Sequence, residues 1–515
     1  MRNFDSEPEG SGGDMKRAML CLCLAALLCA GCREIPSAAN SALPAISSSL
    51  SAEETLAPTA TAAAPAVSHN PTAPVTETQT PQETALRTPE VSAAPTEAQL
   101  RIPALYVEVK GGQTVASTEE YLAAQISLDA RGSGWDSHPA AAAQIRGRGH
   151  STWKWEKKPY KIKFDKAVSL CGMPKARQWV LLANYADKSL SRNYVAASMA
   201  QILDGLDYTP GQSHVELYLN GEYMGVYTLS EQIQVHKNRV NIAESDAADT
   251  GYLLEIGGRD AGSDHDVLNH DYFMAGFARQ IAIKAPDTKV ISQEQLDYII
   301  SYVRAANDAI VAHEGYEQYI DVDSFIDWGI LHELTYNIDS CYRRSCYMTK
   351  DAGGKLKMGP VWDFDLALGN FSKDNQKYND LATVGPGVED LLDYEKLAGM
   401  QYNTYSYDDY YVVLTWMNYL LSDPSFYARY VSRWNQVKER LLEKGLEAID
   451  ESERLLEGAW QKNFERWKVL EGRPAAGYSS KKTAAIKTFA GSVDYLRDFL
   501  KQRYQWLDKR LNREM

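Results

Sequence analysis

The sequence predicts an α+β fold, with a mostly β first lobe and a mostly helical second lobe, preceded by a disordered stalk. Residues 105–256 contain short runs in which apolar and polar side chains alternate, as they do along strands. Residues 408–515 carry apolar side chains at helical spacing. Residues 33–100 are almost without large apolar side chains, so they cannot build a core.

The strand patterns of the first lobe are local and specific. In residues 160–164 the aromatic and aliphatic side chains share one face, and Lys161 and Lys163 share the other. Asn220 and Gly221 separate two alternating runs, which is the strongest short signal for a β-hairpin because both turn positions need a positive φ. Further strands are predicted at residues 105–109, 178–183 and 252–256, and a helix at residues 188–203.

The second lobe is predicted to be mostly helical, with one hairpin. Residues 324–327 resemble a capping box, and the helix that they begin is expected to reach Ile338. Residues 346–349 and 356–361 form the predicted hairpin, which turns at residues 351–354. Several amphipathic helices are expected from residue 408 onward.

Residues 1–32 have the features of an export signal. Met15, Lys16 and Arg17 precede an apolar run from residue 18 to 30, which is too short for a comfortable transmembrane span. Small residues then lead to Cys32, as in a bacterial lipobox, so we expect a lipoprotein anchored to the outer face of the cytoplasmic membrane. The alternatives are signal cleavage with secretion and a single uncleaved anchor. We interpret residues 1–14 as an overlong start.

Residues 33–100 are interpreted as a disordered linker. Their Ala, Ser, Thr, Pro and Glu side chains bury too little apolar surface to offset the entropy lost on ordering. We expect this stretch to act as a stalk that holds the folded part off a membrane or carries it through a cell wall.

Charge and cysteine content exclude some classes of protein. The formal net charge of −14 does not suit a general nucleic-acid binder, which needs clustered Lys and Arg. Only Cys171, Cys341 and Cys346 lie beyond the export signal, too few for a disulfide framework and without zinc-ligand spacing. We therefore expect no structural metal bound by thiolates and no nucleic-acid partner.

A basic, glycine-rich stretch begins at residue 145. Its glycines allow close approach of a backbone to a ligand, and Arg146 and Arg148, followed by Lys161 and Lys163, supply positive charge. This pattern is compatible with a phosphate cradle. A turn with a solvated basic face is the alternative.

A second cluster follows the predicted helix that ends near Asp339. The hairpin comes next, and Trp362, Asp363, Phe364 and Asp365 follow it. A protein kinase has its catalytic Asp, a short hairpin and a metal-binding Asp in the same order. On a strand, Asp363 and Asp365 would face the same way, which favours a cation between them. Surface carboxylates or a structural Ca²⁺ site are the alternatives.

These clusters resemble the CotH (spore coat protein H) kinase family. The resemblance rests on five stretches, residues 145–164, 179–187 with Arg192 and Asn193, 215–242, 333–339 and 355–370. It extends from about residue 105 to the C-terminal helices, so residues 101–515 are predicted to form one CotH kinase-like domain. The resemblance implies an atypical, bilobal protein-kinase-like fold that uses ATP with Mg²⁺ or Mn²⁺.

The resemblance also implies roles for individual residues. Asp339 is the expected catalytic residue, and Asp363 and Asp365 are the expected metal ligands. Asn337 and Glu231 are expected to support the site, with Glu231 paired to Lys161 or Lys163. The nucleotide phosphates are expected to contact four side chains, Arg146, Arg148, Lys161 and Lys163.

Two functional hypotheses follow. The first is an extracytoplasmic kinase that phosphorylates Ser or Thr hydroxyls of cell-surface or coat proteins. The second is a non-catalytic interaction or adhesion module on the same fold. A different nucleotide-dependent transferase that uses the same acids is a further alternative.

Overall fold

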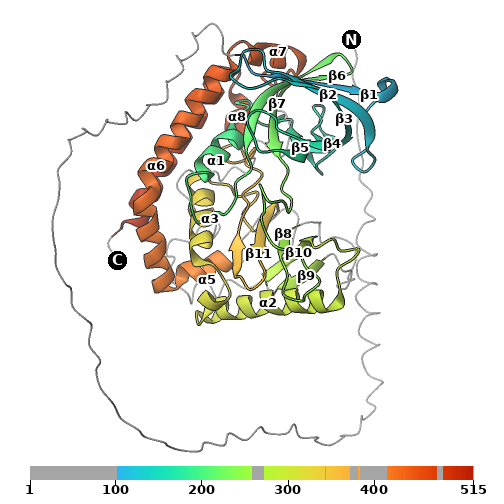
Figure 1. Ribbon diagram of the computed structural model, residues 1–515. Coiled ribbons are helices and arrows are strands. Elements are labelled where there is room, and N and C mark those ends of the chain that lie inside the picture. Colours follow the sequence, from blue (N-terminus) through green and yellow to red (C-terminus); the bar gives the residue numbers. More distant parts are fainter. Residues whose placement is uncertain are drawn as a thin grey trace, which may run out of the picture. The chain divides into compact units, whose positions relative to one another are not determined.

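The computed structural model describes residues 101–257, 272–275, 277–342, 344–371, 381–382, 415–472 and 480–513. The predicted export signal and linker, residues 1–100, lie outside these ranges, and so does residue 408, where the C-terminal helices were expected to start. The described part contains both sheets and helices, which confirms the α+β class (Figure 1).

Seven strands of the first half form a closed barrel in the order β1-β2-β3-β4-β5-β7-β6. The barrel closes where β1 pairs with β6 in parallel, and its other neighbours are antiparallel. The strands are β1 (Ala104–Val109), β2 (Leu122–Asp129), β3 (His138–Gly147), β4 (Tyr160–Val168), β5 (Ala176–Leu182), β6 (Gln212–Leu219) and β7 (Glu222–Glu231).

Alternation decides which side chains fill the barrel. Ile162 and Trp179 are opposite each other on β4 and β5, and both are buried in the barrel core. Lys161 and Lys163 point the other way, as predicted. The predicted hairpin is also confirmed, because Asn220 and Gly221 join β6 to β7 with φ values of 51° and 78°.

A five-stranded sheet follows in the order β12-β11-β8-β10-β9. It is formed by β8 (Tyr252–Ile256), β9 (Tyr272–Ala275), β10 (Phe277–Ala285), β11 (Cys346–Lys350) and β12 (Leu356–Met358). The strand at 252–256 and the 346–358 hairpin were predicted. β9 and β10 were not, so the second half is less purely helical than expected. β10 forms a strand because it pairs with β8, which is distant from it in the sequence. A strand that depends on such pairing is hard to predict from its own residues.

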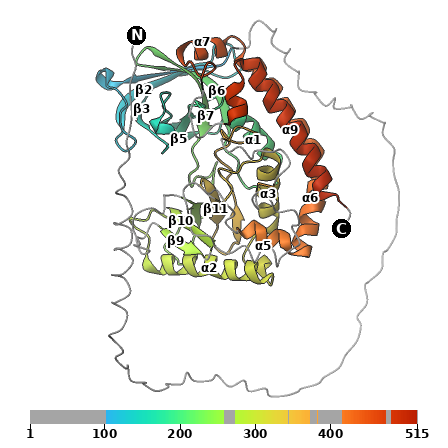
Figure 2. The ribbon, with the colours of Figure 1, turned by 180° about the vertical axis from the view of Figure 1, so that it is seen from behind.

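The helices are α1 (Arg192–Ala200), α2 (Gln293–Ala312), α3 (Val322–Thr335), α5 (Trp416–Ser422), α6 (Pro424–Leu456), α7 (Ala459–Arg466), α8 (Lys481–Ala485) and α9 (Phe489–Leu511). α6 and α9 pack along each other (Figure 2). α7 returns to the barrel and packs on β7. The amphipathic helices predicted near the C-terminus are confirmed from residue 416 onward.

Helix α3 differs from its prediction at both ends. Its N-cap is Asp321, whose side chain accepts a hydrogen bond from Ser324 N at 3.0 Å. The helix ends at Thr335 because Tyr336 takes a left-handed conformation with φ 50°. Asn337 and Asp339 therefore lie on irregular backbone after the helix.

The barrel and the sheet meet through a small apolar cluster. Val180 and Leu182 of β5 pack there with Leu253 of β8, Ala285 of β10 and Trp362. Trp362 thus joins both sheets at the start of the acidic segment. We call residues 362–370 the acid loop.

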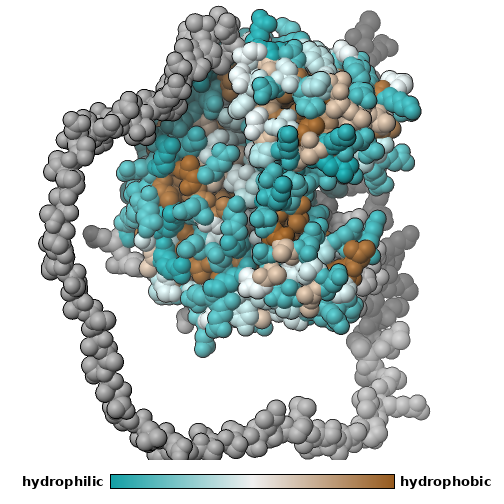
Figure 3. All heavy atoms as spheres, viewed as in Figure 1, coloured by the Kyte–Doolittle hydropathy of each residue, from teal (hydrophilic) through white to brown (hydrophobic). Residues whose placement is uncertain are grey.

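The surface of the described part is mainly polar on the face shown in Figure 3, where apolar residues form only scattered patches. Within the described ranges, every helix is too short or too polar to span a bilayer. Cys171, Cys341 and Cys346 are buried free thiols.

Candidate active site

The acid loop follows β12 as irregular backbone. Asp363 has φ 70°, a left-handed conformation that L-residues other than Asn, Asp and Gly rarely adopt. The expectation that Asp363 and Asp365 lie on one face of a strand is therefore wrong. The turn at Asp363, instead of strand alternation, decides where its carboxylate points.

Side chains near Asp339 hold Asp363. The Asp363 carbonyl oxygen accepts hydrogen bonds from Asn337 Nδ2 at 3.2 Å and from Ser340 Oγ at 2.9 Å. Ser345 Oγ donates to the Asp363 Oδ2 atom at 3.1 Å. The structure thus brings together the segments that carry the predicted catalytic acid and the predicted metal ligand.

Asp365 shows that several carboxylates share this region. Burial raises the pKa of Asp365 well above its usual range, and the charges of Asp363, Asp339 and Asp187 raise it further. Arg148 acts in the opposite direction. The charges of Asp339 and Asp363 therefore act on Asp365, and the roles expected for these three acids stay predictions.

Arg146, Lys161 and Lys163 lie on the outer face of the barrel strands, and Arg148 follows β3. The Arg148 guanidinium lies 5.7 Å from the ring centre of Trp362, which begins the acid loop. Arg146 pairs with Lys161 across β3 and β4, so their side chains share this face. Burial, together with the nearby charges of Arg146, Arg148, Lys284 and Lys163, lowers the pKa of Lys161 to about 8.

The side chain of Arg146 is held by neighbouring residues of the barrel region. Its Nη1 atom donates to the carbonyl oxygens of Thr118 and Gly147, and its guanidinium lies over the ring of Tyr121. Gly147 is needed for packing, because a Cβ there would collide with the indole of Trp153. Of the four basic residues predicted to contact phosphate, Arg148 is the one that contacts the acid loop, through the ring of Trp362.

Glu231 does not have the predicted partner. It lies opposite Trp179 on β5, which lies opposite Ile162, so it shares the core-facing side of the barrel strands. Lys161 and Lys163 alternate to the other side, which prevents the expected pairing. The Glu231 carboxylate instead accepts from Arg239 Nε at 3.3 Å and from Gly211 N at 2.9 Å.

The structure adds three residues that the sequence analysis missed. Lys284 forms an ion pair of 3.1 Å with Glu255 and is one of the charges that act on Lys161. Tyr347 pairs with Glu255 across β8 and β11, and the charges of Arg148 and Asp363 reach it. Glu255 and Tyr347 lie in predicted strands, which was their only sequence signal, and Lys284 lies in β10, which was not predicted.

The donor groups suit a hard divalent cation such as Mg²⁺ or Mn²⁺. Asn337 is fully buried, and its Oδ1 atom accepts no hydrogen bond from the described residues. Asp363 and Asp365 add carboxylate oxygens nearby. In the described ranges, no three His, Cys, Asp or Glu side chains are grouped to hold a metal alone. A Mg²⁺ site needs only one or two carboxylates, because water and phosphate supply the other ligands.

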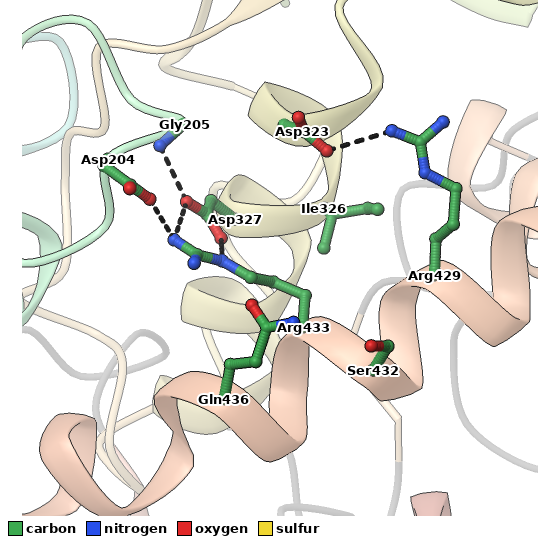
Figure 4. A pocket seen from close by; sticks show the side chains of 9 residues that line it. All are labelled: Asp204, Gly205, Asp323, Ile326, Asp327, Arg429, Ser432, Arg433 and Gln436. Carbon is green, nitrogen blue, oxygen red and sulfur yellow. Dashed lines mark hydrogen bonds and ion pairs between the residues drawn. The ribbon is translucent and has the colours of Figure 1, made fainter.

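A cavity of about 410 Å³ lies elsewhere, between α3 and α6 (Figure 4). Its two arginines pair with aspartates that also line it. Arg433 donates to both carboxylate oxygens of Asp327 at 2.8 and 2.9 Å, and Arg429 donates to Asp323 at 3.0 Å. These pairs join α6 to α3, and we assign no ligand to this cavity.

Sequence comparison shows which family the chain belongs to. The sequence profile of the CotH kinase protein family matches residues 145–507. This range begins in β3, at the basic stretch, and ends in α9, so it includes the acid loop. No curated protein matches the chain. Because the match covers most of the sequence, the chain belongs to the CotH kinase protein family.

Proposed function

We propose that this protein is an extracytoplasmic kinase that transfers the γ-phosphoryl group of ATP to Ser or Thr hydroxyls of cell-surface or coat proteins. Family membership supports a kinase-like transferase. The observation that carries the proposal is that Asn337 and Ser340, on either side of Asp339, both hydrogen-bond to the Asp363 carbonyl oxygen. They do so at a loop whose first residue, Trp362, lies against Arg148. Phosphoryl transfer needs carboxylates to hold the metal ion and orient the acceptor, and cationic side chains to neutralise the phosphate charge.

In the proposed reaction, the acceptor oxygen forms a bond to the γ-phosphorus while the bond to the β-phosphate oxygen breaks. Asp339 orients the acceptor hydroxyl and takes its proton. Arg148 and Lys161 neutralise phosphate charge from the barrel side. A bound Mg²⁺ or Mn²⁺ supplies charge neutralisation at the phosphates, and Asp363, Asp365 and Asn337 are the residues that would hold it.

The arrangement of the chain supports this proposal. In a bilobal interpretation, the barrel is the first lobe, and the five-stranded sheet with the helices is the second. The barrel has its own apolar core, separate from the larger core of the second part. Export and lipidation at Cys32 would place the domain outside the cytoplasm, anchored to the membrane through lipid.

The proposal is tested with the variant Asp363→Asn. Asparagine keeps the volume and tolerates the left-handed conformation, so only the charge is lost. We expect ATP with Mn²⁺ to raise the melting temperature of the parent protein, because a ligand that binds the folded state stabilises it. We expect Asp363→Asn to lose this rise and to lose ATP turnover.

Asp494→Asn is the matched control, because Asp494 is an exposed aspartate on α9 that pairs only with Arg497 in the described contacts. It should behave like the parent. Turnover retained by Asp363→Asn would overturn the assignment of this residue. A parent protein that shows no metal-dependent response to ATP would instead leave the non-catalytic interaction module as the function.

A further inference from the structure

The peptide between Asp363 and Phe364 is held by hydrogen bonds on both of its sides. It follows a residue with φ 70°, a conformation that costs an L-residue free energy unless its surroundings favour it. Two of the restraints come from the segment that carries Asp339, because Asn337 Nδ2 and Ser340 Oγ both donate to the Asp363 carbonyl oxygen. These bonds fix one side of the peptide.

The other side of this peptide is held by Asn193, which the proposed mechanism does not use. The Phe364 N–H donates to Asn193 Oδ1 at 2.8 Å. Asn193 lies in the first turn of α1 and only 6% of its surface is exposed. The bond therefore joins residues 171 positions apart in the sequence, within the interior.

Asn193 is itself fixed from the barrel. Its Nδ2 atom donates to Asn184 Oδ1 at 3.3 Å, and Asn184 Nδ2 donates to Thr228 Oγ1 of β7 at 2.8 Å. A chain of side-chain amides thus runs from the barrel wall to the acid loop. The residue before Asn193 strengthens this contact, since Arg192 Nε donates to the Ala367 carbonyl at 3.1 Å.

We propose that Asn193 is a positioning residue of the proposed phosphotransfer site, which holds the Asp363–Phe364 peptide so that the Asp363 carboxylate stays in hydrogen-bond contact with Ser345 Oγ. This inference rests on the proposed function and assigns a role to a residue that touches neither nucleotide nor acceptor. Without the Asn193 acceptor, the Phe364 N–H loses its partner and the peptide can rotate. Asp363 then relaxes toward negative φ, and its carboxylate leaves the position in which it would hold a cation.

The test measures Mn²⁺ binding by electron paramagnetic resonance in the presence of a non-hydrolysable ATP analogue, so it needs no turnover. Asn193→Leu keeps the approximate volume and removes the acceptor. We expect its Mn²⁺ dissociation constant to rise by about tenfold to a hundredfold, as when a metal ligand loses the group that orients it. Asn193→Asp retains the acceptor oxygen but loses the donor to Asn184 and adds a buried charge, so it should recover only part of the affinity.

Asn463→Leu is the control for a purely structural loss. Asn463 is also a buried asparagine, and its Oδ1 atom accepts a backbone N–H, that of Val226, at 3.0 Å. It lies in α7, away from the acid loop. We expect this variant to melt at a lower temperature than the parent but to bind Mn²⁺ with the parent's affinity.

The possible results separate this inference from the proposed function. Unchanged Mn²⁺ affinity in a folded Asn193→Leu protein sinks the positioning role, even if the parent is an active kinase. If the parent binds no Mn²⁺ with the analogue, the proposed function fails, and the positioning role fails with it. Should Asn193→Leu not fold, Asn193→Ser, whose hydroxyl is too short to reach the Phe364 N–H, must show the same loss.

Discussion

At the scale of single residues, the lowered pKa of Lys161 gives a prediction for nucleotide binding. Lys161 lies among four other cations, and burial is the largest cause of its lowered pKa of about 8. Phosphate oxygens placed beside Lys161 would favour its charged form and raise the pKa again. Nucleotide binding should therefore take up a proton above pH 8.

This gives a pH prediction for Lys161. Between about pH 8 and the usual lysine value of 10.5 the free protein holds Lys161 neutral, so binding must supply the charge. We expect ATP–Mg²⁺ affinity to fall by up to about tenfold per pH unit as the pH rises above 8. Calorimetric titrations at pH 7, 8 and 9 measure the effect. Lys161→Arg, which stays charged, should bind with a flatter pH dependence, and an equally steep one would argue against Lys161 as the titrating group.

At the scale of secondary-structure elements, α9 holds the C-terminal end of α3 in place. Arg503 of α9 and Glu333 of α3 form a buried ion pair of 2.8 Å, and Arg503 Nε also donates to the Glu333 carbonyl at 2.8 Å. The Arg503 guanidinium lies over the ring of Tyr336, the residue that caps α3. The C-terminal helix thereby fixes the start of the segment that carries Asn337 and Asp339.

Breaking this pair should strongly destabilise the protein. Arg503→Met leaves the Glu333 carboxylate buried without its cation, at a cost of about 3–5 kcal/mol in the free energy of unfolding. Urea denaturation monitored by tryptophan fluorescence measures the change. The double variant Arg503→Met with Glu333→Gln removes the unpaired charge and should regain part of the loss. If both variants unfold at the same urea concentration, the buried charge is not the cause.

At the scale of the whole molecule, two buried histidines link stability to pH. Burial lowers the pKa of His214 to about 4 and that of His332 to about 3, although Asp187 opposes the shift at His214. His214 lies in barrel strand β6, and His332 lies in α3 between the rings of Trp328 and Phe364. The folded protein therefore disfavours the charged form of His214 in the barrel and of His332 in α3.

Below pH 6.5 the unfolded chain binds protons at these histidines that the folded chain does not bind. The free energy of unfolding should fall as the pH falls from about 6.5 toward 4, by up to about 1.4 kcal/mol per pH unit for each histidine. Urea titrations at pH 7.5, 6 and 5 test this. His332→Phe keeps an aromatic ring in the stack and should remove about half of the slope. An unchanged slope in that variant would exclude His332 as a source.

Much of the site followed from local sequence. The alternation in residues 160–164 placed Lys161 and Lys163 on one face, and the Asn220–Gly221 turn set the β6–β7 hairpin. The order of Asp339, hairpin and acid loop predicted that Asp339 and Asp363 belong to one site, and Asn337 and Ser340, on either side of Asp339, do hydrogen-bond to Asp363. The roles of the acids themselves stay predictions. Such patterns are readable because each depends on neighbours within a few residues.

Only the tertiary structure decided which distant groups meet. Glu231 pairs with Arg239 because barrel register puts it on the core-facing side, whereas the sequence order suggested a lysine. Helix α3 stops at Thr335 where Tyr336 packs against α9, and Asn193 reaches Phe364 across 171 residues. The sequence by itself determined the conformation and facing of each segment, since alternation and turn chemistry are local. Partners were decided by packing, because the free energy of a long-range contact depends on how all the segments fit together.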